Sequence, residues 1–119
     1  MKKINKKALK AKADKIFSFT IRNRDICQLR GLDSIKCTNT LQCMHIISRS
    51  NHRLRWDEKN ALCGCSGHHM FYTSHPWEFV EVIKSNFPQI YEYVNSKRNE
   101  LWDKDIQKVI DDLIGGENI

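Results

Sequence analysis

The sequence contains no apolar run that approaches the roughly 20 residues needed to cross a bilayer. Its lysine-rich N-terminus is followed by no apolar segment of the kind found in secretory signals. Internal repeats and low-complexity linkers are also missing. We therefore expect a cytoplasmic protein without membrane contact, and at 119 residues a single domain over residues 1–119.

The five cysteines are an odd number in a chain without an export signal. This argues against a disulfide framework, which belongs to oxidising compartments. It favours reduced thiolates that bind a metal, and zinc is the natural choice. Three of the cysteines and four of the five histidines fall within residues 43–69.

Acidic residues are fewer than basic ones, 14 against 20, which gives a formal net charge of +6. An excess of Lys and Arg favours an anionic partner, most commonly a nucleic acid, because it neutralises phosphates. The alternative is a basic surface that only keeps the protein soluble. The charge is uneven, with seven lysines in residues 1–15 but seven acids against four bases in residues 90–119.

Hydrophobic periodicity predicts an α+β chain. Apolar residues at helical spacing predict a helix over residues 6–22 with a lysine-rich outer face. The predicted helix belongs to a basic N-terminal segment, residues 1–24. In the core that follows, residues 25–75, the sequence predicts a loop, a strand over 41–47, a basic loop and a second strand over 61–63. A short helix beginning at His68 or His69 and ending near Tyr72 follows.

A helical cap is predicted over residues 76–119. Its helices are expected over about 76–86, 88–100 and from Ile106 to the glycine pair at 115 and 116. The lysine-rich helix could grip phosphates or be a solvated face. The acidic C-terminal helices are interpreted as packing elements or a partner surface.

Three residues in the core suggest phosphodiester chemistry. His45 lies near the end of the first strand, Asn60 opens the second, and His69 begins a helix. Metal-assisted cleavage needs N or O ligands with open water positions, and a base that accepts a proton near neutral pH. The hairpin can bring these three residues together.

The order His45, Asn60, His69, ending in "NALCGCSGHH", resembles the HNH endonucleases of the ββα-metal class. The segments "KIFSFTIRNRD" and "HIISRSNHRLRWDEKNAL" are similar to phage HNH proteins, including the NinG recombination proteins of lambdoid phages. The resemblance covers about residues 14–86. It implies a ββα-metal hairpin-helix core with flanking helices, and a DNA endonuclease located in the host cytoplasm if a phage encodes it.

The resemblance also assigns roles. It makes His45 the general base that activates water, and gives a catalytic Mg²⁺ or Mn²⁺ ion to Asn60 and His69. It also implies that three arginines contact phosphates: Arg49, Arg53 and Arg55. The alternative interpretation is that these arginines belong to a solvated basic loop without a binding role.

One position departs from the family pattern. HNH proteins usually carry Asp or His as a metal ligand immediately before the base, and here that residue is Met44, a poor ligand for a hard cation. Some members of the class use asparagine as the main protein ligand. The residues that could fill the place are His75 and Cys43.

A second, structural metal is implied as well, because family members often bracket the hairpin with two C-x2-C knuckles. The second knuckle reads Cys65-Ser66-Gly67-His68, and the first is broken because Arg30 stands three residues after Cys27. Cys37 is the replacement. The expected zinc ligands are Cys27, Cys37, Cys65 and His68. The alternative is that these cysteines are buried free thiols without a metal. Cys63 is expected to face the core.

Two other functions stay open at this point. The chain could be a zinc-stabilised DNA-binding module in which Met44 records a lost active site. It could also be a partner protein that uses its C-terminal helices, with an incidental basic surface.

Overall fold

The computed structural model describes residues 5–102 and 104–117. Residues 1–4, which include two lysines of the basic segment, lie outside the described residues, as do residues 103, 118 and 119. Within the described part, six α-helices and one 3-10 helix accompany a two-stranded antiparallel sheet, so the fold is α+β. The elements are α1 (Lys6–Arg22), β1 (Leu41–His45), α2 (His52–Arg55), η1 (Glu58–Asn60), β2 (Ala61–Cys65), α3 (Ser66–Ser74), α4 (Pro76–Asn86), α5 (Pro88–Lys97) and α6 (Ile106–Glu117).

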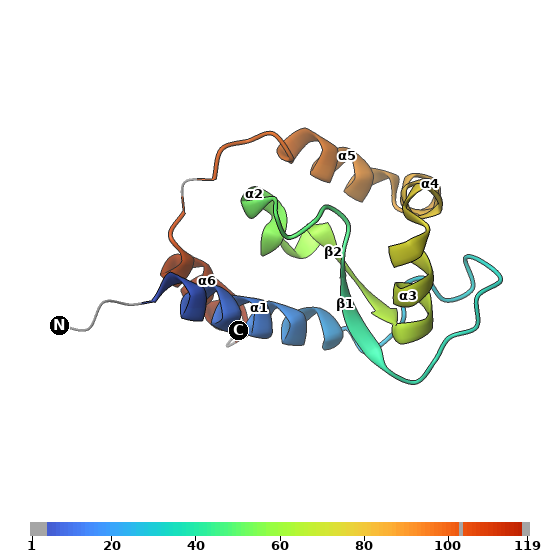
Figure 1. The fold of residues 1–119 in the computed structure, drawn as a ribbon, viewed down its shortest axis with the longest axis horizontal. Helices are drawn as coiled ribbons and strands as arrows, with labels where there is room; N and C mark the ends of the chain where they lie inside the picture. The colour runs from blue at the N-terminus through green and yellow to red at the C-terminus, as the bar shows by residue number, and fades with distance from the viewer. Residues whose placement is uncertain (1–4, 103, 118–119) are drawn as a thin grey trace.

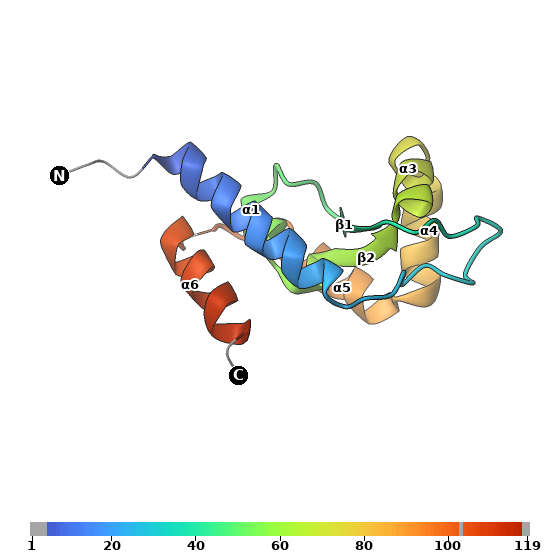
Figure 2. The same cartoon turned by 90° about the horizontal axis from the view of Figure 1, so that it is seen from below.

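The hairpin of β1 and β2 stands between two groups of helices (Figures 1 and 2). Its register pairs Leu41 with Cys65 and His45 with Ala61. One face packs on α1 and α6, and the buried residues there include Phe17, Cys63 and Ile110. The other face packs on α3 and α4 through a second apolar cluster that contains Met44, Leu62, Tyr72 and Ile83.

Helix α1 has the predicted bounds, and its buried residues Ala13, Phe17 and Ile21 recur every four positions on one side. Asn5 caps the helix by accepting a hydrogen bond from the Lys7 backbone N–H at 2.9 Å. The partner of this apolar side is α6, which buries Ile106 and Ile110. The packing interpretation of the last helix is therefore confirmed.

Several predicted boundaries differ from the structure. Strand β1 ends at His45 instead of residue 47. The Asn60 side chain forms hydrogen bonds with the backbone N–H and the carbonyl of Ile47, so these groups do not pair with a neighbouring strand. Strand β2 continues to Cys65, and α3 begins at once because Cys65 is its N-cap. The polar segment 48–59 holds the short helix α2, which was not predicted. The glycines at 115 and 116 do not end α6, which runs to residue 117.

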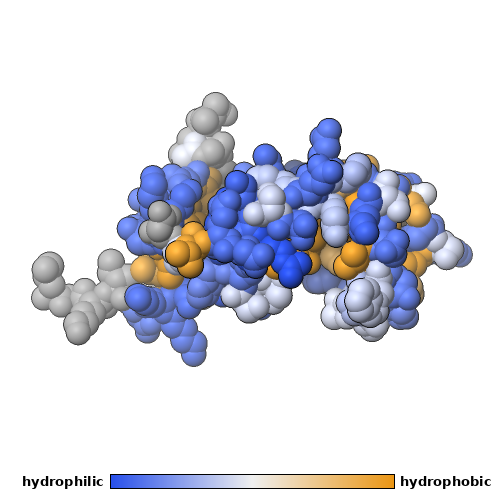
Figure 3. Space-filling view, turned by 90° about the horizontal axis from the view of Figure 1, so that it is seen from above, coloured by the Kyte–Doolittle hydropathy of each residue, from blue (hydrophilic) through white to orange (hydrophobic). Residues whose placement is uncertain are grey.

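The upper face in Figure 3 is mostly hydrophilic, with apolar residues in small, separate patches. None of the helices in the described residues is both long and apolar enough to cross a membrane.

Candidate functional site

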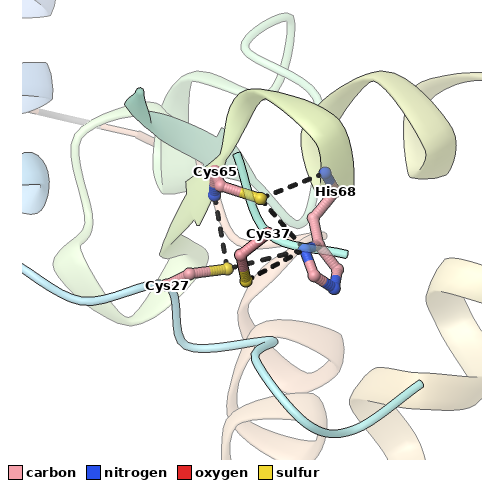
Figure 4. Close-up of side chains that lie close together, drawn as sticks. All are labelled: Cys27, Cys37, Cys65 and His68. Carbon is pink, nitrogen blue, oxygen red and sulfur yellow. Dashed lines mark hydrogen bonds between the residues drawn. The ribbon is translucent and has the colours of Figure 1, made fainter. Parts of the chain in front are cut away.

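Four metal-ligating side chains converge at the start of α3. Cys27 and Cys37 come from the loop that follows α1, Cys65 ends β2, and His68 lies in the first turn of α3. Their ligand atoms all lie within 4.8 Å of one another, and Figure 4 shows the four side chains pointing toward a common centre. In the described part of the chain, this is the one group of three or more His, Cys, Asp or Glu side chains close enough to hold an ion.

The distances suit a tetrahedral site. The His68 Nδ1 atom lies 3.0 Å from the Cys65 sulfur, 3.7 Å from Cys27 and 3.8 Å from Cys37. Zinc bonds of about 2.3 Å to sulfur and 2.0–2.1 Å to nitrogen place tetrahedral ligands roughly 3.5–3.8 Å apart. The separations from Nδ1 to Cys27 and Cys37 lie in this range, and the separation to Cys65 is shorter. This Cys3His group could hold a structural metal such as zinc.

The loop is held beside the sheet by its own hydrogen bonds. Gln28 donates its backbone N–H to the Cys63 carbonyl at 2.7 Å, and its side-chain oxygen accepts from the Cys63 N–H at 2.8 Å. Arg24 donates to the Ala61 carbonyl at 2.9 Å. These bonds carry Cys27 to the end of β2, where its sulfur accepts from the Cys65 backbone N–H at 3.3 Å.

The pKa of the Cys65 thiol is lowered in the folded chain. Burial raises its pKa, but hydrogen bonds from the backbone and ring of His68 and from Thr38 outweigh that effect and lower the pKa of Cys65 to about 6. A thiolate is the form that binds a metal. The position of Cys65 at a helix N-terminus therefore favours the ligating state.

The orientation of His68 depends on Asp33, which the sequence did not single out. The His68 Nε2 atom lies 2.9 Å from Asp33 Oδ1, and the Tyr72 hydroxyl donates to Asp33 Oδ2 at 2.6 Å. A carboxylate oxygen accepts, so Nε2 carries a proton, and Nδ1 is the ring nitrogen that faces the sulfurs. A bound metal would take the Nδ1 lone pair in place of the hydrogen bond from Nδ1 to Cys65. A carboxylate that orients a metal-binding histidine is a recurring device in metal sites.

His45 has a different environment, at the end of β1. Its Nε2 atom lies 2.9 Å from the Arg55 carbonyl oxygen, and its ring lies beside that of Phe17 with centroids 5.4 Å apart. A carbonyl can only accept, so Nε2 donates and Nδ1 is the unprotonated nitrogen. Burial lowers the pKa of His45, against the raising effect of the Arg55 carbonyl.

Asn60 is fully buried, and its side-chain amide forms hydrogen bonds with backbone groups. The side-chain oxygen accepts from the Ile47 N–H at 2.8 Å, while the amide nitrogen donates to the Ile47 and Leu54 carbonyls at 3.0 and 3.1 Å. In this structure the Asn60 amide is therefore bonded to backbone groups, and its contact with a metal stays a prediction. The residue fastens both ends of the loop between the strands.

His69 faces β1. Its Nδ1 atom lies 2.7 Å from the Gln42 side-chain oxygen, and burial lowers the pKa of His69. With Nδ1 donating to Gln42, Nε2 is the nitrogen that could ligate an ion. No hydrogen bond joins His45, Asn60 and His69 to one another among the described residues.

Met44 is a core residue. It is 2 % exposed, and a Cβ at Gly64 would overlap its sulfur. Cys43 points to the opposite face of the strand, since neighbouring side chains alternate. His75 stacks on Phe71 with centroids 4.0 Å apart and bonds the Phe71 carbonyl. In the described part of the chain, neither Cys43 nor His75 belongs to the group of side chains close enough to hold an ion, and a catalytic ion at His69 stays a prediction. Such an ion can keep several waters and bind substrate phosphate oxygens.

The three arginines differ in their surroundings. The Arg49 side chain is 61 % exposed, whereas those of Arg53 and Arg55 are 23 % and 16 % exposed. Arg53 bonds Asp57 and Glu100, and Arg55 makes two hydrogen bonds to Asp14. Arg49 also pairs with Asp14, but at 3.7 Å and with most of its side chain exposed, so it can reach a phosphate more readily than the other two.

No protein-family model, curated protein or solved structure matches this chain.

Proposed function

We propose that the chain is a metal-dependent, HNH-type DNA endonuclease with a structural zinc site, acting in phage DNA processing or recombination. The state of His45 carries the proposal. The ring is fixed by the Arg55 carbonyl, so its free nitrogen is the basic one. A fixed, neutral imidazole is what a general base requires near pH 7.

In this function, His45 Nδ1 accepts a proton from water while the water oxygen attacks phosphorus in line with the leaving sugar oxygen. Burial keeps the imidazole neutral at pH 7, because it lowers the pKa of His45. The Phe17 ring limits how far the imidazole can turn. His45 thus begins each turnover in the correct protonation state and orientation.

His69 is the residue that would hold Mg²⁺ or Mn²⁺ through Nε2. A bound ion supplies charge stabilisation at the phosphate. Gln42 accepts from Nδ1 and thereby keeps Nε2 free of a proton. Water and substrate oxygens would complete the coordination of such an ion.

Exposed cations support DNA as the substrate. Arg49 lies four residues after His45, and Lys12 and Lys15 lie on the exposed side of α1. Such side chains bind phosphates without reading sequence.

A zinc-stabilised DNA-binding module without catalysis is the second candidate. It is favoured by the burial of Met44 and by the complete hydrogen bonding of the Asn60 amide, which reduce the ligands available to a catalytic ion. A partner protein that uses its last helix is less well supported, because α6 already packs its apolar side on α1.

The deciding experiment compares wild type, His45→Ala and His52→Ala on supercoiled plasmid and on a synthetic branched junction. His52 is an exposed histidine of α2 and serves as the matched control. The reactions contain Mg²⁺, Mn²⁺ or no added ion. A strong chelator is avoided because it would also strip the Cys3His site, and zinc content is measured in each sample.

We expect cleavage by wild type and His52→Ala with either ion, and none by His45→Ala, which still binds DNA. If no protein cleaves either substrate while all bind DNA with a steep salt dependence, the binding module is correct. If none binds DNA, both proposals fail.

A further inference from the structure

His45 is held by groups from three elements. It ends β1, packs against Phe17 of α1, and donates to the carbonyl of Arg55, the last residue of α2. The carbonyl selects the ring nitrogen that carries the proton. Whatever fixes this carbonyl therefore controls the chemical state of the proposed base.

Helix α2 cannot fix the carbonyl by itself. It has four residues, and a single turn is unstable in isolation because nucleation costs more than one hydrogen bond returns. The last carbonyls of a helix also have no partner within the helix. The Arg55 carbonyl is one of these, so its position depends on tertiary contacts.

Asp14 of α1 supplies such contacts on both sides of the peptide group. Its Oδ1 accepts from Arg55 Nε at 3.0 Å and from Trp56 Nε1 at 2.9 Å, and its Oδ2 accepts from Arg55 Nη2 at 2.6 Å. The Arg55 carbonyl belongs to the peptide bond between Arg55 and Trp56. One carboxylate therefore holds the two side chains that flank the peptide group to which His45 is bonded.

We propose that Asp14 is a positioning residue for His45, which holds the peptide group between Arg55 and Trp56 and so fixes the proton of the imidazole on Nε2. The proposal builds on the endonuclease function above. The proposal gives α1 a role in positioning His45 as well as a role in the core, because Asp14 and Phe17 lie one turn apart and act on the same imidazole.

The charged groups facing His45 are Arg49, Arg55 and Asp14. Asp14 is part-buried, and although burial raises its pKa, bonds from Arg55 and Trp56 and the charge of Arg49 lower it overall. The carboxylate is therefore ionised at neutral pH. Its loss would remove a negative charge near His45 and loosen the carbonyl, and both changes lower the pKa of His45.

The test is ¹⁵N NMR of the His45 ring in wild type, Asp14→Ala and Glu100→Ala. Glu100 is the matched control because it binds Arg53, the other paired arginine of α2, and does not touch the peptide group of interest. In wild type and Glu100→Ala we expect the Nε2–H tautomer alone. In Asp14→Ala we expect a detectable Nδ1–H fraction and a lower titration midpoint.

Cleavage kinetics supply the second readout. We expect kcat of Asp14→Ala to fall roughly tenfold to a hundredfold with little change in KM, as for a misplaced catalytic group. If Asp14→Ala keeps its fold, its tautomer and its midpoint, Asp14 is only structural and the proposal is overturned.

Should Asp14→Ala not fold, Trp56→Phe removes one of the three hydrogen bonds and keeps an aromatic ring in the core. A measurable Nδ1–H fraction in this variant supports the proposal, and an unchanged tautomer overturns it. If wild type does not cleave DNA, the endonuclease function fails, while the NMR result still decides the part played by Asp14.

Discussion

His68 and Asp33 lie 35 positions apart in the sequence and share one hydrogen bond of 2.9 Å between Nε2 and a carboxylate oxygen. That bond turns the other ring nitrogen toward three cysteine sulfurs. The Cys3His group is thus oriented by a residue that is not a ligand. At His45 the aspartate is one step further away, because Asp14 binds the Arg55 and Trp56 side chains that flank the peptide group bonded to the imidazole.

Loss of one cluster thiol should remove the metal and destabilise the fold. We expect Cys65→Ser to bind much less than one equivalent of zinc and to melt at least 10 °C lower, because metal-binding energy is folding energy in such sites and about 1 kcal/mol shifts Tm by several degrees. Zinc analysis and thermal unfolding measure this. Cys43→Ser, which changes a thiol outside the cluster, should keep its zinc. Equal zinc content in both variants would contradict the assignment.

Asp33 should tune the affinity of the site. Asp33→Asn keeps an oxygen that can accept from His68 but loses the charge, so we expect zinc affinity to fall roughly tenfold. Competition with a chromophoric chelator measures the change. Asp111→Asn replaces an exposed acid of α6 and serves as the control. An affinity that is the same in both variants would show that Asp33 does not support the metal.

Asn60 should matter for stability in the absence of any catalytic ion. Asn60→Asp cannot donate to the Ile47 and Leu54 carbonyls, and we expect a loss of about 2–4 kcal/mol because buried partners remain unsatisfied. Denaturant unfolding of the zinc-loaded protein without Mg²⁺ or Mn²⁺ tests this. The exposed Asn39→Asp is the control. Destabilisation that appears only when Mg²⁺ or Mn²⁺ is added would instead support the ligand interpretation.

The arginines should separate into two kinds. Arg49→Ala should leave stability within about 0.5 kcal/mol and reduce the salt slope of DNA binding by about one. Arg55→Ala should cost about 1–3 kcal/mol, because it removes two of the three hydrogen bonds to the part-buried Asp14 carboxylate. Fluorescence anisotropy at several salt concentrations and denaturant unfolding provide the two readouts. Identical behaviour of the two variants would refute the distinction.

The pH dependence should reflect the buried state of His45. Burial lowers its pKa below the usual value of about 6.5, so the neutral base persists into more acidic solution. We expect the cleavage rate to fall on acidification with a midpoint below pH 6.5. The unfolded chain binds this proton at a higher pH, so His45 also reduces stability as the pH falls below 6.5. A rate that already halves between pH 7.5 and 6.5 would contradict this assignment.

Local patterns were sufficient for much of the architecture. The helical spacing of apolar residues predicted α1 over residues 6–22 and α4 over 76–86, and both have those bounds. For the metal cluster, the ligand set came from the resemblance to HNH proteins, whose hairpins are often bracketed by two knuckles. The structure brings together the four residues that the sequence suggested.

Asn60 shows where such patterns leave a choice open. The same residue type can ligate a metal or bind backbone, and the sequence around it is compatible with either. The choice depends on burial and on the position of residues 47 and 54, which the loop brings to it.

The sequence by itself determined the α+β class, the main helices and the set of thiols and histidine that meet at the candidate metal centre. Periodicity and residue chemistry are local properties, so they can be recognised without coordinates. Only the tertiary structure decided that Asp33 orients His68 and that Asp14 holds the peptide group bonded to His45. A single aspartate in a loop or on a helix looks like any solvated acid until packing brings its distant partner within hydrogen-bond distance.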